Sequence, residues 1–331
     1  MPEVSLCRRS GGFLFFPDPQ PSSALSPRSR TMFYGIFCTF AAYILWGLFP
    51  FYFHALANIG AMEILAHRVV WSLLFIALVI LVMRRTAWLK DALTSPRILL
   101  IFTASALLVG ANWGTYVYAI VTDRTIEASL GYFINPLVSI LLSAVFLREK
   151  LRAAQKIAVG LAAAGVLWIS WVKGVPPFLG LALAFTFGVY GLIRKIAPLG
   201  SIEGLTLESL ILTPIALLWL GYLGSTGELA FADASGTTQL LLIAAGPITA
   251  IPLLLFASGV RSIPYSTSAI IQYVSPSMVF LIGVFAFNEP FTLEMLIGFL
   301  FIWSAVALFL GETVLMQRRL RLEARKKADE V

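Results

Sequence analysis

The sequence predicts an all-α, polytopic membrane protein with ten transmembrane helices arranged as two inverted five-helix repeats. Three observations predict this class: an apolar composition, ten apolar segments of membrane-spanning length, and an internal similarity between the two halves. Hydrophobic residues make up 59% of the chain and charged residues only 12%, with a mean hydropathy of +0.88. Because a soluble domain usually carries about 25% charged residues, this chain has too little polar surface to cover itself in water.

The apolar segments are each long enough for a helix to cross the hydrocarbon core of a bilayer, which takes about 20 residues. Several are interrupted by a proline, a glycine or a single charge. In chain order they cover residues 33–54, 62–83, 98–121, 126–147, 153–172, 177–195, 203–223, 238–260, 265–287 and 291–315. An even number of spans places both termini on the same side of the membrane.

The basic residues indicate which side that is. With the N-terminus in the cytoplasm, every lysine and arginine except Arg68, Arg124 and Lys173 falls in a cytoplasmic segment. Cytoplasmic loops of membrane proteins carry such an excess. The net charge of +7 is therefore topological and does not indicate a nucleic-acid partner. We expect a multi-pass protein of the bacterial inner membrane with both termini in the cytoplasm and the lipid bilayer as its surroundings.

The two ends of the chain differ from its apolar body. Residues 1–31 contain an apolar patch too short for the signal-peptide core of about 7–15 residues, followed by prolines. They are expected to be a disordered extension, or the product of an over-called start with Met32 as the initiator. Residues 32–172 are expected to form the first repeat, 173–317 the second, and 318–331 a basic cytoplasmic tail.

An internal similarity supports this division. A shift of 140 positions lays "LGYFINPLVSILLSAVFLREKL" over "IIQYVSPSMVFLIGVFAFNEPF", so that Pro136 meets Pro276 and Glu149 meets Glu289. Each half then holds five spans, and an odd number forces the second half to cross the membrane in the opposite direction. Inverted repeats of this kind are common in secondary transporters, whose substrate site lies between the repeats near the midplane.

The two matched prolines predict helix breaks at that depth. Pro136 and Pro276 cannot donate a backbone hydrogen bond, which would free the carbonyls of Tyr132 and Gln272. A free carbonyl in hydrocarbon is costly unless it faces protein or a wet cavity. We therefore predict a polar cavity between the fourth and ninth spans; the alternative is a pair of kinks that neighbouring helices satisfy without a ligand. Its expected lining is Tyr132, Asn135, Gln272, Tyr273 and Ser275.

A charged group opens the second span. Glu63 and His67 share a helix face, and Arg68 lies beside them, about one turn inside the external boundary. An arginine there serves either as an interfacial anchor or as a group that attracts an anionic or zwitterionic substrate, with His67 as a titrating neighbour. The same shift of 140 positions places Arg68 opposite Glu208, so a charge pair across the repeats is a further hypothesis.

Other polar and aromatic residues within the spans are also candidates. Asn112 and Trp113 lie between two glycines, where a cavity lining and an interhelical hydrogen bond are equally expected. Trp46 and Tyr190 occupy equivalent positions and are expected to stack on the substrate. Glu149 and Glu289 are interpreted as carboxylates at the starts of the next helices rather than as proton carriers. Glu127, at the outer start of the fourth span, is a candidate external gate or coupling group.

The sequence also excludes several classes of chemistry. Cys7, Cys38, His54 and His67 are all the cysteines and histidines of the chain, too few for a metal cluster or a disulfide framework. No P-loop is present. We therefore expect no cofactor and an ion gradient as the energy source, with H⁺ as the candidate coupling ion; a uniporter without a coupling ion is the alternative.

Four stretches resemble one family. "EILAHRVVWS", "EASLGYFINPLVSILL", "GLALAFTFGVYGLIRK" and "LLIAAGPITAIPLLLFASGVRSIPYSTSAIIQYVSP" are similar to the RarD group of EamA-type transporters, in the drug/metabolite transporter superfamily. The resemblance extends from about Met32 to Gln317. It implies ten spans in two inverted EamA repeats, cytoplasmic termini and export of small molecules.

These observations together predict a secondary-active permease that exports a small amphipathic or zwitterionic metabolite or drug by alternating access. The protein is not expected to be an enzyme. The rival interpretation is a membrane-embedded lipid-modifying transferase that uses Glu63, His67 and Arg68. A non-transporting receptor or assembly subunit is a third. A homodimer is the candidate assembly.

Overall fold

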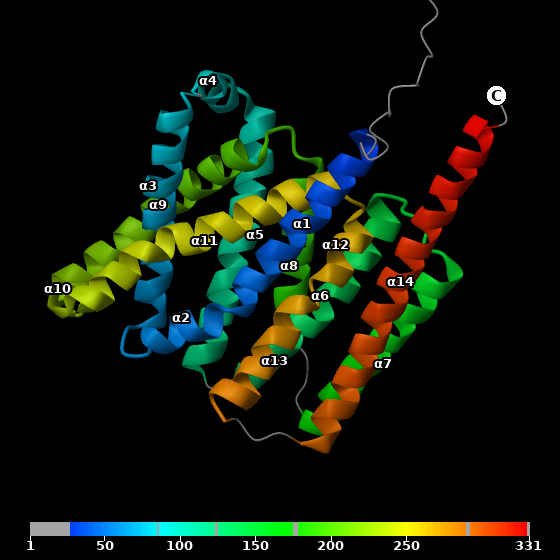
Figure 1. The fold of residues 1–331 in the computed structure, drawn as a ribbon. Helices are drawn as coiled ribbons and strands as arrows, with labels where there is room; N and C mark the ends of the chain where they lie inside the picture. The colour runs from blue at the N-terminus through cyan, green and yellow to red at the C-terminus, as the bar shows by residue number, and fades with distance from the viewer. Residues whose placement is uncertain (1–26, 85, 123–124, 175–177, 289–291, 330–331) are drawn as a thin grey trace, which may run out of the picture.

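The computed structural model describes residues 27–84, 86–122, 125–174, 178–288 and 292–329, and every regular element among them is a helix (Figure 1). The first half contains α1 (Pro27–Gly47), α2 (Phe49–Ala55), α3 (Ala61–Met83), α4 (Ala87–Thr94), α5 (Pro96–Val121), α6 (Thr125–Phe146) and α7 (Ala153–Lys173). The second contains α8 (Phe178–Ile196), α9 (Ser201–Thr226), α10 (Ala230–Asp233), α11 (Gly236–Ser262), α12 (Tyr265–Ile271), α13 (Val274–Ala286) and α14 (Leu293–Asp329).

The predicted fold class is confirmed. Within the described ranges, nine helices are long and apolar enough to cross a membrane, and a shorter apolar stretch, Gly131–Phe146, lies in α6. The helix pair α1 and α2 forms one of the nine spans, and α12 and α13 form another. The short helices α4 and α10 connect spans. The result is five spans in each half.

The packing between helices repeats when the two halves are exchanged. α1 packs on α11 as α8 packs on α5, α3 packs on α11 as α9 packs on α5, and α6 packs on α8 as α13 packs on α1. Three further pairs join equivalent helices: α3 with α9, α6 with α12, and α7 with α14. Two repeats related by a pseudo-twofold axis give this pattern. Figure 1 shows α7 and α14 side by side at one edge of the bundle.

The bundle has two chemically different ends. We call one the basic end, because α3, α6, α8 and α11 end there and basic residues lie in or close to these helix ends. Among these are Arg84, Arg148, Arg152, Lys195 and Arg261. The start of α1 and the end of α14 lie at this end as well (Figure 1). The ends of α2, α5, α7, α9 and α13 define the opposite end.

The terminal helices extend beyond the expected segment boundaries. α1 begins at Pro27, before Met32, and α14 continues as one helix through the basic tail to Asp329. Residues 1–26 of the expected N-terminal extension lie outside the described residues.

The helix interruptions differ from those expected at the two prolines. α6 runs without interruption through Pro136, so the predicted break there is wrong; a proline can be carried inside a membrane helix when its surroundings satisfy the backbone. The second predicted break lies one turn before Pro276, at Gln272 and Tyr273 between α12 and α13. The Gln272 carbonyl is not free either, because the Ser275 N–H donates to it at 3.1 Å in a tightened turn.

An interruption that the sequence interpretation missed separates α1 from α2. Leu48 interrupts the helix, and Pro50 follows in the first turn of α2. Pro50 cannot donate to the carbonyl four residues before it, while Leu48 bonds back to Ile44 and Leu45. α2 also contacts α13, so the two interrupted spans meet.

Close packing of α7 on α14 depends on a glycine. A Cβ built at Gly165 would lie 2.8 Å from the Gly298 carbonyl oxygen, whereas one built at Gly160 on the same helix meets nothing within 4 Å. We predict that Gly165→Leu lowers the stability of the purified protein by about 1–3 kcal/mol, the usual cost of overpacking. Thermal unfolding in detergent measures this, with Gly160→Leu as the matched control. Equal unfolding midpoints for the two variants would contradict the close helix contact.

Candidate functional site

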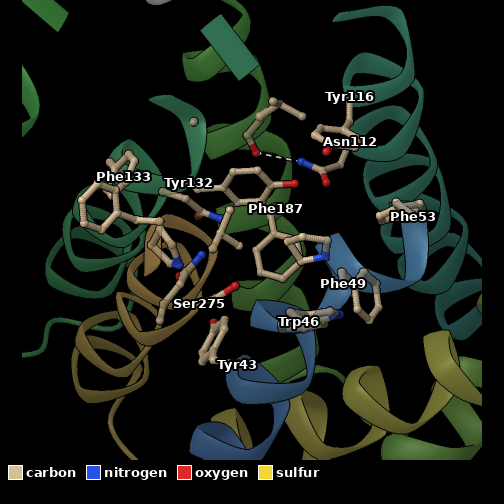
Figure 2. A pocket seen from close by; sticks show the side chains of 18 of the residues that line it. Tyr43, Trp46, Phe49, Phe53, Asn112, Tyr116, Tyr132, Phe133, Phe187 and Ser275 are labelled. Carbon is tan, nitrogen blue, oxygen red and sulfur yellow. Dashed lines mark hydrogen bonds between the residues drawn. The ribbon is translucent and has the colours of Figure 1, made fainter. Parts of the chain in front are cut away.

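A cavity of about 310 Å³ lies between the two halves of the bundle (Figure 2). Both halves supply its walls, from α1, α2, α3, α5, α6 and α7 on one side and α8, α11, α13 and α14 on the other. Aromatic side chains form much of the lining. These are Tyr43, Trp46, Phe49, Phe53, Trp113, Tyr116, Tyr132, Phe133, Phe187, Phe280 and Phe299. The polar side chains of the described lining are Arg68, Asn112, Asn135, Gln272 and Ser275.

The cavity extends toward one end of the bundle only. At the opposite end its lining includes Phe53, near the end of α2, and Met295, near the start of α14. Toward the basic end it stops at Gln272, about two helical turns after α12 begins. The cavity therefore reaches from the middle of the bundle to the opposite end.

The deep part of the cavity carries amide and hydroxyl groups. Asn135, Gln272 and Ser275 line it and are each at most 8% exposed. The Ser139 hydroxyl donates to Asn135 Oδ1 at 3.4 Å. The structure thus brings together three of the five residues expected around the two prolines, and Tyr132 lines the same cavity. Tyr273 does not; its buried hydroxyl donates to the Phe133 carbonyl at 3.3 Å.

Asn112 fulfils both of its expected roles. It lines the cavity, and its Nδ2 donates to the Leu183 carbonyl and the Thr186 hydroxyl, each at 2.9 Å. These bonds tie α5 to α8, across the two halves (Figure 2). Trp113, the next residue, also lines the cavity.

Arg68 is the charged residue of the described cavity lining. Its Nε donates to the Thr249 hydroxyl on α11 at 3.0 Å. Its Cζ lies over three aromatic rings, 4.8 Å from the centroid of Trp113 and 5.8 Å from those of Phe49 and Phe53. The guanidinium is thus held by one hydrogen bond and by cation–π contacts.

The hypothesis of an Arg68–Glu208 pair is wrong. Glu208 instead lies 3.4 Å from Arg194 Nη1 and accepts a 2.5 Å hydrogen bond from the Ser105 hydroxyl. Arg68 lies in the second turn of α3, which starts at the opposite end, and Glu208 lies in the second turn of α9, which starts at the basic end. Inversion therefore places these equivalent positions at opposite depths.

A packed layer closes the basic-end side of the cavity. Tyr190 belongs to this layer and not to the cavity lining; it stacks on Phe256 with centroids 6.2 Å apart, and its hydroxyl lies 3.4 Å from Glu208. Tyr265 donates to the Gly188 carbonyl at 2.7 Å. Trp46 does line the cavity, with its ring 5.7 Å from that of Phe187. The rings of Trp46 and Tyr190 both contact Phe187 and Phe256, but of the two only Trp46 lines the cavity.

Glu149 joins the two halves at the basic end. Its carboxylate accepts hydrogen bonds from the backbone N–H groups of Tyr265 and Ser266, at 2.7 and 3.0 Å, and from the Ser266 hydroxyl at 2.6 Å. It thus binds a helix N-terminus, as expected of its charge, but that of α12 in the other half rather than that of the next helix. Glu289 and the side chain of Glu127 lie outside the described residues.

Glu63 and His67 also have structural partners. Glu63 accepts from the backbone N–H groups of Ala230 and Phe231 at 3.1 and 2.9 Å, and so fixes the start of α10. His67 Nδ1 accepts from Trp71 Nε1 at 3.1 Å, and its Nε2 lies 3.8 Å from Glu63. Neither residue lines the cavity. Of the three residues proposed for a transferase, Glu63 and His67 therefore lie outside the cavity, and Arg68 lines it.

Several lining residues were not singled out from the sequence. Tyr43, Phe49, Phe53, Tyr116 and Phe187 belong to helices that are apolar on all sides, so periodicity does not separate cavity-facing from lipid-facing rings. One signal was available for two of them. Phe49 comes directly before Pro50 and Phe53 follows three residues after it, and a proline within a membrane span marks a candidate interruption.

The fold and the cavity define the class: a polytopic membrane protein with a small-molecule cavity between two inverted halves, the architecture of a membrane transporter. Residues 32–171 match the family model "EamA-like transporter family". The chain belongs to this family, in its RarD group.

Relatives from several bacteria share nearly the whole chain. The "Uncharacterized transporter YojE" of Bacillus subtilis is 44% identical over 86% of this chain and 96% of its own. "Protein RarD" of Escherichia coli is 37% identical, again over 86% and 96%. "Chloramphenicol-sensitive protein RarD" of Pseudomonas aeruginosa is 33% identical over 88% and 97%. The first of these relatives is named as a transporter, and none of the three has the name of an enzyme.

A solved crystal structure has the same fold. It superposes with a TM-score of 0.65, at 18% identity, and the match covers 85% of this chain and 98% of that one. At this identity the likeness supports the fold alone.

The buried ion pair of Glu208 and Arg194 is expected to contribute to the stability of the protein. We predict that Glu208→Gln lowers stability by about 3–5 kcal/mol, because it leaves a guanidinium that is 1% exposed without a counter-charge. Glu312→Gln is the matched control: its partner Arg152 is 40% exposed, and such pairs contribute about 0–1 kcal/mol. Unfolding midpoints of the two purified variants check this, and equal losses would contradict it.

Proposed function

We propose that the protein is a secondary-active permease of the bacterial inner membrane that exports a small amphipathic metabolite or drug. The observation that carries the proposal is the cavity, which lies between the two halves and reaches only one end of the bundle. By the excess of basic residues, the basic end is cytoplasmic and the opposite end is external. Both termini are then cytoplasmic, and the structure corresponds to an outward-facing state.

Alternating access requires that the closed end can open. The basic end is closed by the hydrogen bonds of Glu149 to α12, by Tyr265 on Gly188, and by Lys195 Nζ, which donates to the Val260 and Ile263 carbonyls at 2.9 and 2.6 Å. Glu149 belongs to the first half and α12 to the second. Rocking of one half against the other breaks the Glu149 contacts, because these join the two halves, and exposes the cavity to the cytoplasm; the Tyr265 and Lys195 contacts lie within the second half and move with it.

An ion gradient is the proposed energy source, since the sequence has no nucleotide-binding motif. Protons are the proposed coupling ion. Titratable side chains are present at membrane depth in Glu208, which a tyrosine and a serine hydroxyl also contact, and in His67. In a uniporter, the alternative, neither Glu208 nor His67 would need to gain or lose a proton during transport. A homodimer stays the candidate assembly.

The cavity assignment predicts which variants lose export. Cells that overproduce the wild-type protein are expected to enrich at least one compound in the medium, relative to cells that overproduce Asn135→Ala or Gln272→Ala at equal membrane level. Each change removes an amide from the deep part of the cavity, so we expect about a tenfold loss of export, the usual value of one hydrogen bond in a desolvated site. Untargeted metabolomics of the medium measures it.

The control truncates an amide outside the cavity. Gln239 donates to the Phe231 carbonyl at 3.0 Å and does not line the cavity, so Gln239→Ala should export as the wild type does. A compound exported equally by all four proteins would show that the substrate takes another path. Identical media from wild-type cells and cells without the protein would count against the export function itself.

A further inference from the structure

Arg68 has hydrogen-bonding capacity that the protein leaves unused. Its Nε is bonded to Thr249, but no described residue accepts a hydrogen bond from Nη1 or Nη2. In the described part of the chain, a few side-chain polar atoms are fully buried and lack a hydrogen-bond partner, and neither terminal nitrogen of Arg68 is one of them. Since Arg68 lines the cavity, its terminal N–H groups are accessible from it.

No charge on the described cavity lining compensates this guanidinium. Every other described lining residue is aromatic, aliphatic, or a neutral amide, hydroxyl, glycine, proline or methionine. A cation in a low-dielectric site without a counter-charge is costly, and a carboxylate that binds it in a forked geometry gains two charge-assisted hydrogen bonds. The site is therefore electrostatically complementary to an anion.

From this arrangement we infer that Arg68 is an anion subsite and that the transported compounds are organic carboxylates with an aromatic or apolar body and no charged amine. The inference deepens the proposed function and rests on it, since it names the substrate class of the same cavity. It differs from the expectation of a zwitterion. An ammonium group would find no carboxylate among the described lining residues and would repel Arg68.

The surroundings fit the rest of such a molecule. Trp113, Phe49 and Phe53 lie around the guanidinium, and Tyr132 and Phe187 continue the aromatic wall (Figure 2). The amides of Asn135 and Gln272 line the same cavity. The volume of about 310 Å³ lies at the small end of the range of roughly 300–1,000 Å³ for small-molecule sites. One or two rings with a carboxylate therefore fit better than a large drug.

Arg194 shows why this arginine differs from a structural one. Arg194 is 1% exposed and has Glu208 as its counter-charge, with further bonds from Nη2 to the Ser201 and Gly200 carbonyls. Among the described residues, Arg68 has one hydrogen-bond partner, the Thr249 hydroxyl. An interfacial anchor would place the guanidinium at the lipid surface, whereas Arg68 lines a cavity between the halves.

Four ring-matched probes test the inference by charge: phenylacetate, phenylacetamide, phenethylamine and phenylalanine. Binding to the purified full-length protein is measured by intrinsic tryptophan fluorescence, since Trp46 and Trp113 line the cavity. We expect phenylacetate to bind about tenfold more tightly than each of the others, the usual value of a charge-assisted hydrogen bond. Equal or tighter binding of phenylalanine or phenethylamine, or no binding of any probe at millimolar concentration, would overturn the inference.

Variants of Arg68 test whether this residue causes the preference for phenylacetate. Arg68→Gln should weaken phenylacetate binding about tenfold and leave phenylacetamide binding unchanged, which also shows that the cavity is intact. Arg68→Lys should bind phenylacetate with intermediate affinity, because it keeps the charge but loses the fork. Arg152→Gln removes an arginine outside the cavity and should change nothing. Unaltered preference for phenylacetate in Arg68→Gln would contradict the subsite; if that variant does not fold, Arg68→Lys and the probe series decide.

Uptake into proteoliposomes separates the inference from the proposed function. Phenylacetate that binds through Arg68 but is not moved would support the subsite and count against the permease. Movement of phenylalanine or phenethylamine that is insensitive to Arg68→Gln would support a permease and overturn the inferred substrate class.

Discussion

Hydrocarbon offers no hydrogen-bond partners, and this constraint decides where the helices of this protein can be interrupted. The two interrupted spans, α1–α2 and α12–α13, pack against each other and both border the cavity. At each interruption a proline follows within the next turn. At the second one, the Ser275 N–H donates to the Gln272 carbonyl that Pro276 cannot reach. The irregular backbone therefore lies between the halves, where polar amides can be exposed to a ligand instead of to lipid.

Two arginines, Arg194 near the basic end and Arg68 near the opposite end, differ in how their charges are balanced. Arg194 is neutralised by Glu208, and the pair is tied to Ser105 and Tyr190 by side-chain bonds. This cluster joins α5, α8 and α9 beside the packed aromatic layer. Arg68 is held by Thr249 and aromatic rings, and no side chain of the described residues forms an ion pair with it. Arg194 thus stabilises its part of the bundle through an ion pair, whereas the charge of Arg68 is not neutralised by a side chain of the described residues.

Much of this fold was predictable from the sequence, because membrane helices need long apolar segments whatever they pack against. The amide-lined part of the cavity was predictable as well, since Asn135 and Gln272 stand out in such segments. The partner of Glu208 was not, because the repeat identifies equivalent positions while inversion places them at opposite depths. The helix that Glu149 caps could not be inferred either, since local spacing indicates only the next helix in the chain.

The central claim is that the cavity is open to the outside and sealed toward the cytoplasm. Ser275 lies deep in the cavity, so a Ser275→Cys variant, with Cys7 and Cys38 replaced by serine, reports access by reaction with a membrane-impermeant thiol reagent. We predict labelling in intact cells and little in inside-out vesicles, with vesicle labelling increased by Glu149→Gln, which weakens the contact with α12. Labelling from the cytoplasmic side alone would contradict the outward-facing assignment, and no labelling from either side would contradict the cavity.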